Sequence, residues 1–316
     1  MRRISGLVLA AAVAVCAQGD LSGQFHHLCT FGSKMGIHPP RILNRKSAIA
    51  AMGKSEFPYG LGFPVAVATD ARNRVWITDS ATASIHVFDR ASGAYQEIRR
   101  VADQQLVQPA GIAADAQGRI YAVDSGTGNI YVFDEKGEYD RSLVKRGHFL
   151  QKPTALALSE DGRTVYVADP PKNAVFALNR EGEVNTTIQL PADFGEALSI
   201  STVDNQVYVL GARQHKVLMF SPAGRPRGER RWDAVPIPSA FAYDAIGRRF
   251  LLADPRLGVV QIFDESGRNL SVFGQLGEGV DQAQRIESMY IDPKGLVYLV
   301  ASHEGKVLVF ADGQIR

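Results

Sequence analysis

The chain has 316 residues, of which 45% are hydrophobic and 22% are charged, and its formal net charge is +2. This composition excludes an intrinsically disordered chain, which would be poorer in apolar residues and less balanced in charge. The near-neutral charge also argues against a dedicated nucleic-acid-binding protein, which would show a strong basic excess.

The first 17 residues have the pattern of a secretory signal peptide. Two arginines near the start are followed by an apolar run over residues 4–15, which is too short to span a bilayer. We therefore expect residues 1–17 to direct export to the periplasm or cell envelope.

Two processing outcomes stay open at the end of this segment. Cleavage after Ala17 would leave Gln18 as the first residue. Alternatively, residues 13–16 resemble a bacterial lipobox, in which Cys16 would be acylated and would anchor the protein to a membrane. Val15 departs from that pattern, because lipoboxes usually have Gly, Ala or Ser at this position.

Three landmarks recur six times after residue 58 and predict a repeat architecture. The first is a tight turn between two apolar runs, and the second is a strand that ends in Asp in four of the six copies. The third is another apolar strand, followed by a turn at glycine. The first turns close on Gly or Asn, which accept a left-handed backbone, at intervals of 42 to 48 residues. These closing residues are Asn73, Gly118, Gly162, Asn205, Gly247 and Gly295.

Short strands rich in β-branched and aromatic residues at this period are typical of propeller blades. We therefore predict an all-β fold, a six-bladed β-propeller with four-stranded antiparallel blades, over residues 41–316. The expected blades cover about residues 59–100, 101–146, 147–190, 191–232, 233–276 and 277–316.

The sixth copy lacks an outer strand, and we expect an N-terminal strand to complete it. Residues 47–52, within the segment 41–58, form an apolar run just before the first blade and are the predicted donor. Their pairing would close the ring and cover an open sheet edge. Residues 18–40, which include Pro39 and Pro40, are then predicted to form an extended leader.

Within the repeats, residues 108–115, 118–126 and 132–134 resemble the unit of the NHL-repeat β-propellers. The similarity extends from about residue 59 to the end of the chain. It departs from the family pattern before the third strand, where NHL repeats usually carry Asn-Arg and this chain does not. The resemblance implies a propeller with a ligand-binding face, of the kind found in exported bacterial members, and implies no single chemistry.

Copies four and six depart from the others on one face of the predicted ring. The Asp that ends the second strand is replaced by Gly211 and Ala301. Where the regular copies have a proline before the inner strand, copy four has Glu196 and copy six has Ile286, followed by Glu287. These departures indicate a candidate site near the central channel.

Charged side chains and histidines in the neighbouring loops extend this candidate site. The candidate metal ligands are Glu196, His215, Glu287 and His303. The candidate ligand-binding residues are Arg213, His215, Arg256, His303 and Glu304. The alternative is sequence drift on solvated loops, since the spacing is not that of a tight metal site. The recurring acids are instead expected to cap the backbone of each loop; they are Asp79, Asp124, Asp169 and Asp254.

The predicted inner strands, such as residues 65–68 and 111–113, are small and apolar, which weakens an enzymatic interpretation. Lactonases of similar fold carry metal ligands there, and related lyases use clustered histidines. We therefore assign no catalytic residue, expect no cofactor, and favour a non-enzymatic scaffold that binds an envelope protein, peptide or glycan. A metal-assisted lyase or lactonase is the alternative, and a purely structural envelope lipoprotein is a third hypothesis. We expect a monomer that binds no nucleic acid and contacts a membrane only through a lipid on Cys16.

Overall fold

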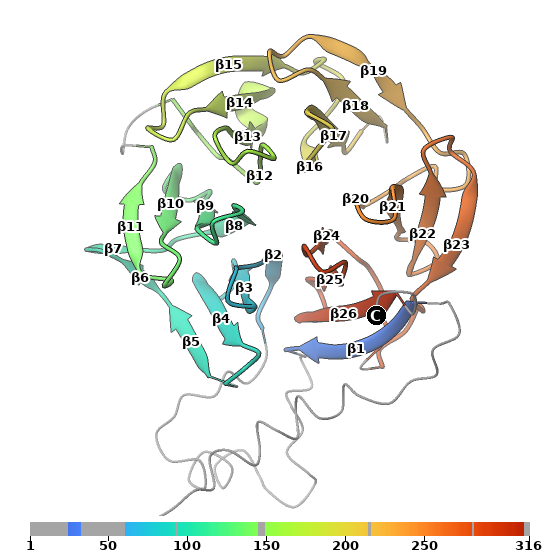
Figure 1. Cartoon of the computed structure of the whole chain (residues 1–316), viewed down its shortest axis with the longest axis horizontal. Coiled ribbons are helices and arrows are strands. Elements are labelled where there is room, and N and C mark those ends of the chain that lie inside the picture. The colour runs from blue at the N-terminus through green and yellow to red at the C-terminus, as the bar shows by residue number, and fades with distance from the viewer. Residues whose placement is uncertain are drawn as a thin grey trace, which may run out of the picture.

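The computed structural model describes residues 25–32, 61–92, 94–144, 149–213, 216–279 and 281–312. They form six four-stranded antiparallel sheets, arranged as blades around a central opening (Figure 1). The predicted all-β, six-bladed propeller is confirmed. Apart from a 3-10 turn, η1 (Pro170–Lys172), the regular elements of the described residues are strands. None of these residues belongs to a helix with the length and hydropathy of a membrane span.

In the first three blades, the strands run in chain order between the channel and the rim. Blade 1 contains β2 (Pro64–Thr69), β3 (Arg74–Asp79), β4 (Ser84–Asp89) and β5 (Tyr95–Ile98). A two-stranded ribbon, β6 (Arg100–Val101) and β7 (Gln104–Gln105), follows it. Blade 2 contains β8 (Pro109–Ala114), β9 (Ile120–Asp124), β10 (Asn129–Phe133) and β11 (Tyr139–Ser142). Blade 3 contains β12 (Ala155–Leu158), β13 (Val165–Asp169), β14 (Ala174–Leu178) and β15 (Val184–Gln189).

The last three blades follow the same order, except that the sixth takes one strand from the N-terminal region. Blade 4 contains β16 (Ala197–Val203), β17 (Gln206–Gly211), β18 (Val217–Phe220) and β19 (Pro226–Arg230). Blade 5 contains β20 (Ala240–Asp244), β21 (Arg249–Asp254), β22 (Val259–Asp264) and β23 (Asn269–Phe273). Blade 6 contains β24 (Ser288–Ile291), β25 (Val297–Ala301), β26 (Lys306–Asp312) and β1 (Phe25–Phe31).

The hydrophobic core is divided into clusters that lie between neighbouring blades. Six such clusters occur among the described residues, one for each pair of adjacent blades around the ring. In the cluster between blades 1 and 2, Trp76 of β3 lies 5.3 Å from Phe133 of β10, measured between ring centroids. The faces of each sheet are covered by the next blade, so the stability of every blade depends on its neighbours.

The aspartates that end the second strands organise the loops at one end of the ring. Asp79 is fully buried, and its carboxylate accepts hydrogen bonds from the backbone N–H groups of Gly62, Phe63 and Ala81 at 2.6 to 3.0 Å. Asp124 makes the corresponding bonds in blade 2. The predicted capping role of these aspartates is confirmed in these blades.

The ring is closed by β1, which pairs antiparallel with β26 and forms the outermost strand of blade 6. An N-terminal strand therefore completes the last blade, as predicted, but the segment chosen from the sequence was wrong. Phe25–Phe31 occupies the place predicted for residues 47–52, and part of the proposed extended leader 18–40 is a strand. Residues 47–52 lie outside the described residues. The ring of Phe25 stacks on Phe273 of blade 5 at 4.3 Å, and this contact helps to select β1 for the seam.

Substitution of Leu28 by Asp tests this closure. Leu28 packs against the cluster between blades 6 and 1, so a carboxylate there would lose apolar contacts and be partly desolvated. We expect the free energy of unfolding to fall by roughly 2 kcal/mol or more. Thermal or urea unfolding of Leu28→Asp beside Ile49→Asp provides the measurement. An equal or greater loss for Ile49→Asp would contradict the closure by β1.

Candidate functional site

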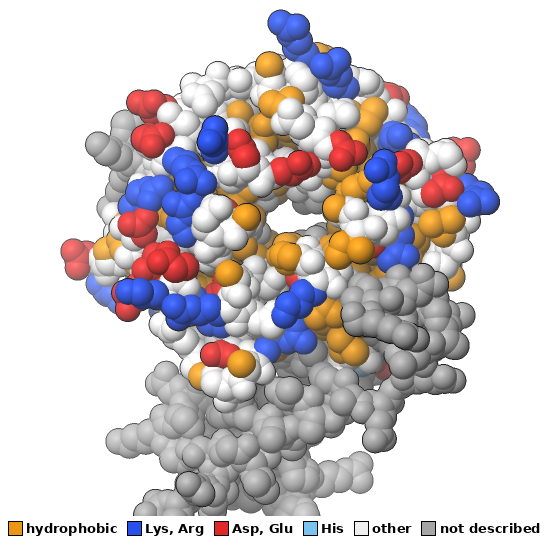
Figure 2. Space-filling view, in the orientation of Figure 1, with side chains coloured by type: hydrophobic (Ala, Val, Ile, Leu, Met, Phe, Trp, Pro, Cys, Tyr) orange, Lys and Arg blue, Asp and Glu red, His pale blue; other side chains and the backbone are white. Residues whose placement is uncertain are grey.

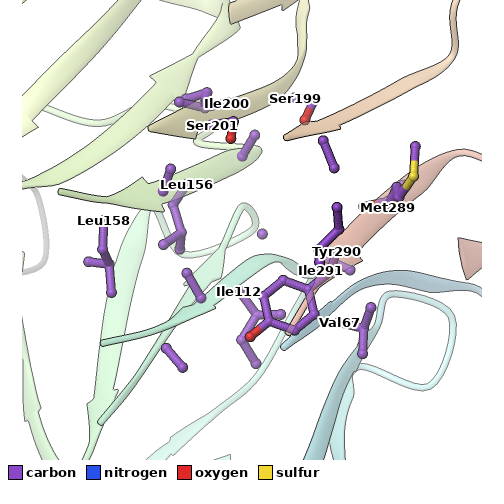
Figure 3. Close-up of a pocket in the computed structure, with 18 of the residues that line it drawn as sticks. Val67, Ile112, Leu156, Leu158, Ser199, Ile200, Ser201, Met289, Tyr290 and Ile291 are labelled. Atoms are coloured by element: carbon purple, nitrogen blue, oxygen red, sulfur yellow. The ribbon is translucent and has the colours of Figure 1, made fainter. Parts of the chain in front are cut away.

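A channel of about 640 Å³ runs along the inner strands of all six blades. The space-filling view shows it as an opening through the ring (Figure 2). Side chains such as Val67, Ile112, Leu156 and Met289 come from different inner strands and surround this space (Figure 3). The small apolar residues that the sequence predicted for the inner strands are therefore present on the wall, together with polar side chains such as Ser199, Ser201 and Thr202 of β16.

The two ends of the channel differ in the segments that form them. At one end lie the turns between first and second strands. The other end is formed by the segments that lead into the inner strands and by the loops between second and third strands, and we call it the loop face. Because the strands of each blade are antiparallel, the described candidate residues all lie on this face. They are Glu196, Arg213, Arg256, Glu287, His303 and Glu304. His215 lies outside the described residues.

The register of blade 4 corrects the alignment of Glu196. Ala197 pairs with Gly211, as Pro64 of blade 1 pairs with Asp79, so Ala197 and not Glu196 occupies the proline position. The same β-bulge follows Pro64 in blade 1, so the offset of one residue arises in the turn: four residues connect the paired Thr202 and Val207, and five connect Thr69 and Val75. The side chain of Glu196 is exposed, whereas its carbonyl accepts a hydrogen bond from the backbone N–H of Ala212 at 2.8 Å.

Blade 4 replaces its missing aspartate by an aromatic ring. A Cβ atom at Gly211 would lie 2.5 Å from the ring of Phe194, so only glycine fits beside this side chain. Phe194 is fully buried, and its carbonyl accepts a hydrogen bond from the N–H of Arg213 at 3.1 Å. The loss of the acid at position 211 is thus explained by packing, without a ligand.

Blade 6 replaces its missing aspartate by Glu304. One oxygen of Glu304 accepts a hydrogen bond from the N–H of Gln284 at 2.7 Å. Gln284 precedes Ala301 by 17 positions, as Val107 precedes Asp124, and Asp124 accepts the corresponding bond from Val107 at 2.9 Å. This contact gives Glu304 a structural role in the loop. The ligand-binding role that the sequence suggests for it stays a prediction.

Glu287 and His303 lie together at the mouth of the channel on the loop face. Oε2 of Glu287 accepts a hydrogen bond from the N–H of Ser302 at 2.9 Å. Oε1 is buried and has no hydrogen-bond partner among the described residues, although Nε2 of His303 lies 3.5 Å from it and Nε of Arg285 lies 3.6 Å from it. The glutamate is 20% exposed and the histidine 59%. The ring of His303 also lies edge-on to Phe63, at 5.3 Å between centroids.

Burial raises the pKa of this carboxyl group. Desolvation raises the pKa of Glu287 above its ordinary value, and the opposing effects of the Ser302 N–H, His303 and Arg285 do not cancel it. A carboxylate with a raised pKa at the mouth of an apolar channel is a frequent property of binding and catalytic sites.

The other predicted residues do not join this pair. Arg256 is 56% exposed, with its Nε 3.6 Å from Oδ1 of Asp254, and the side chain of Arg213 is also exposed. Within the part of the chain that the structure describes, no group of three His, Cys, Asp or Glu residues is arranged to hold a metal ion. Of the four candidate metal ligands, Glu287 and His303 lie together, whereas Glu196 is exposed and does not join them. His215 is not among the described residues.

Sequence reasoning missed three residues of the mouth, namely Phe63, Arg285 and Thr154. Thr154 holds the same register position in blade 3 as Glu287 in blade 6, since the N–H of each donates to the second strand of its own blade. The two blades lie on opposite sides of the six-bladed ring. Oγ1 of Thr154 is buried and, like Oε1 of Glu287, has no hydrogen-bond partner among the described residues. Counting back from the closing glycine of the first turn aligns these residues, since Thr154 precedes Gly162 and Glu287 precedes Gly295 by eight positions each.

Comparison with known proteins supports the fold and leaves the family open. The chain matches no family model and no curated protein sequence. Membership in the NHL-repeat family therefore stays a prediction.

Solved structures of similar shape include two lyases and a nidogen/laminin complex. A catalytically inactive histidine-to-alanine variant of virginiamycin B lyase from Staphylococcus aureus, with quinupristin, is 14% identical with a TM-score of 0.60, over 81% of this chain and 83% of that chain. A streptogramin B lyase is 12% identical with a TM-score of 0.56, over 81% and 95%. A nidogen/laminin complex gives 21% identity and a TM-score of 0.54, over 66% and 79%. Identities this low show the shared fold alone.

Substitution of Glu287 by Gln tests whether the ionised carboxylate lowers the stability of the folded protein. Because its pKa is raised in the folded state, the ionised group destabilises the fold at neutral pH, and the neutral amide is expected to raise the melting temperature by roughly 2 °C.

The difference in melting temperature between Glu287→Gln and the unsubstituted protein should increase as the pH rises. It is expected to be complete above the raised pKa and to vanish below about pH 4, where the glutamate is protonated in both folded and unfolded states. Melting curves of Glu287→Gln between pH 3.5 and 8 measure it, with the exposed Glu196→Gln as the matched control. A lower melting temperature for Glu287→Gln at neutral pH would instead indicate a structural role.

Proposed function

We propose that the protein is a non-enzymatic propeller of the bacterial cell envelope that binds a protein, peptide or glycan through its loop face. The observation that carries the proposal is the buried Oε1 of Glu287, which lacks a hydrogen-bond partner among the described residues and lies at the mouth of an apolar channel. An unsatisfied buried acceptor is costly, so a group kept in this state favours a ligand that supplies the missing donor.

The surroundings of Glu287 support recognition by binding. The adjacent side chains of Phe63, Arg285 and His303 offer an aromatic face and cationic groups, and two of them are exposed at the mouth. They are carried by loops of a ring whose blades are packed on both sides. A rigid scaffold that presents variable loops is a common arrangement for binding sites.

Export is part of the same proposal. It rests on the signal-like residues 1–17, with Cys16 as the candidate lipid anchor. Every described strand lies after this segment, since β1 begins at Phe25, and removal of residues 1–17 would leave the closing strand intact. A ligand in the envelope is therefore the expected partner.

Photo-crosslinking in the envelope tests the loop face as the binding surface. A photoreactive residue replaces either Leu257, which is 54% exposed on the loop face, or Ile246, which is 64% exposed on the opposite face. With residues 1–17 in place, we expect a discrete adduct from position 257 that is severalfold stronger than from position 246 and is weakened by Arg213→Glu. Adducts of equal strength from both faces, or no adduct, would count against the proposal.

A metal-assisted lyase is the second candidate, and the proximity of Glu287 and His303 favours it. Two of the similar structures are lyases, one of them with quinupristin. The binding proposal predicts no conversion of quinupristin when the purified protein is incubated with it and with magnesium or zinc ions, as followed by mass spectrometry. Turnover that is lost in His303→Ala and retained in an Arg256→Ala control would replace the scaffold proposal by the enzymatic one.

A further inference from the structure

We infer that the loop-face mouth recognises the free amino terminus of an apolar peptide, with the ammonium group at Glu287 and the first side chains in the channel. This inference rests on the proposed function and narrows its ligand to one chemical class. It is carried by three observations, which concern the carboxylate, the opposite wall and the channel.

The carboxylate selects a cationic donor. Oε2 of Glu287 is already occupied by the Ser302 N–H, so Oε1 is the oxygen that a ligand would reach. The neighbouring nitrogens of His303 and Arg285 lie at 3.5 and 3.6 Å, too far for good hydrogen bonds. An ammonium group has three N–H donors and a full charge, which makes it the strongest partner for such an oxygen.

The position of His303 makes this oxygen reachable. The imidazole is 59% exposed and rests edge-on against Phe63, so rotation of the side chain would open Oε1 to the mouth.

The opposite wall favours a peptide over a simple amine. Thr154 lies at the level of Glu287 in blade 3, and its buried Oγ1 has no hydrogen-bond partner among the described residues. Ser239, at the same level in blade 5, donates its hydroxyl to the carbonyl of Ile286 at 2.5 Å. The Thr154 hydroxyl is therefore a donor available to a carbonyl of the ligand, and a peptide presents carbonyl groups next to its amino terminus.

The channel below the mouth favours apolar side chains. Val67, Ile112, Leu156 and Met289 line it, and its volume of about 640 Å³ falls within the usual range for small-ligand sites (Figure 3). Apolar residues that follow the amino terminus would gain free energy by leaving water there. Ser201 is one of several polar side chains on the wall, and its hydroxyl can bond to the peptide backbone.

A pair of peptides that differ only in the terminal charge tests the inference. Val-Leu-Leu amide with a free amino terminus and its N-acetylated form are titrated into the purified protein at pH 7.5 by calorimetry. We expect the free peptide to bind about tenfold or more tightly than the acetylated one, because acetylation removes the charge and two N–H donors.

Two glutamate variants show whether Glu287 is responsible for the preference for the free amino terminus. Glu287→Gln keeps the shape of the side chain and is expected to reduce the preference to less than about twofold. Glu181→Gln makes the same change at an exposed position outside the channel and is expected to retain the preference.

Three outcomes would overturn the inference. They are equal affinity for the two peptides, a preference that persists in Glu287→Gln, and the absence of binding by either peptide. In each case, a crosslink from position 257 that is absent from position 246 would still support a binding function for the loop face. Failure of the ligand class is therefore distinguishable from failure of the proposed function.

Discussion

The constraint on which the whole structure depends is that each blade must be covered on both faces. A four-stranded sheet of this length cannot bury its apolar residues alone, and the six clusters of the core each take side chains from two adjacent blades. An open row of blades would leave two apolar faces in water, so the last blade has to meet the first. Leu61, Ile77 and Val309 lie in the cluster that joins blades 6 and 1. The channel and the loop face exist only because this contact is made.

The repeated part of the fold could be predicted because its signals are local. Turn residues such as Asn73 and Gly118 have positive φ angles in the structure, and capping acids such as Asp79 bond to backbone groups nearby. The closing strand could not be found in this way. As the outermost strand it pairs along one edge, and its contacts, such as that of Phe25 with Phe273, join residues far apart in the sequence. A more apolar segment close to blade 1 was therefore chosen in its place.

The sequence predicted only part of the candidate site, because some of the contacts that assemble the site join residues of different repeats. The loss of the acids at Gly211 and Ala301 drew attention to blades 4 and 6, yet each loss has its own structural compensation, by Phe194 and by Glu304. Oε1 of Glu287, like Oγ1 of Thr154 and Oε2 of Glu304, is buried without a hydrogen-bond partner among the described residues, and packing does not explain this. The hydrogen bonds of the register place Glu287 at the level of Thr154, because the backbone N–H of each donates to the second strand of its own blade.

The position of the closing strand in the sequence also determines when the ring can close during folding. Thr30 pairs with Leu308, which lies 278 positions later, so the first described strand to leave the ribosome or to cross a membrane has to wait for the last. Until then, the nascent chain carries an unpaired strand and two uncovered blades, which are targets for chaperones and for aggregation. Contacts between such distant residues form slowly, and ring closure is expected to be a late step of folding, after synthesis has ended. Under the proposed export, late closure would leave the chain without the pairing of its closing strand until β26 is also available.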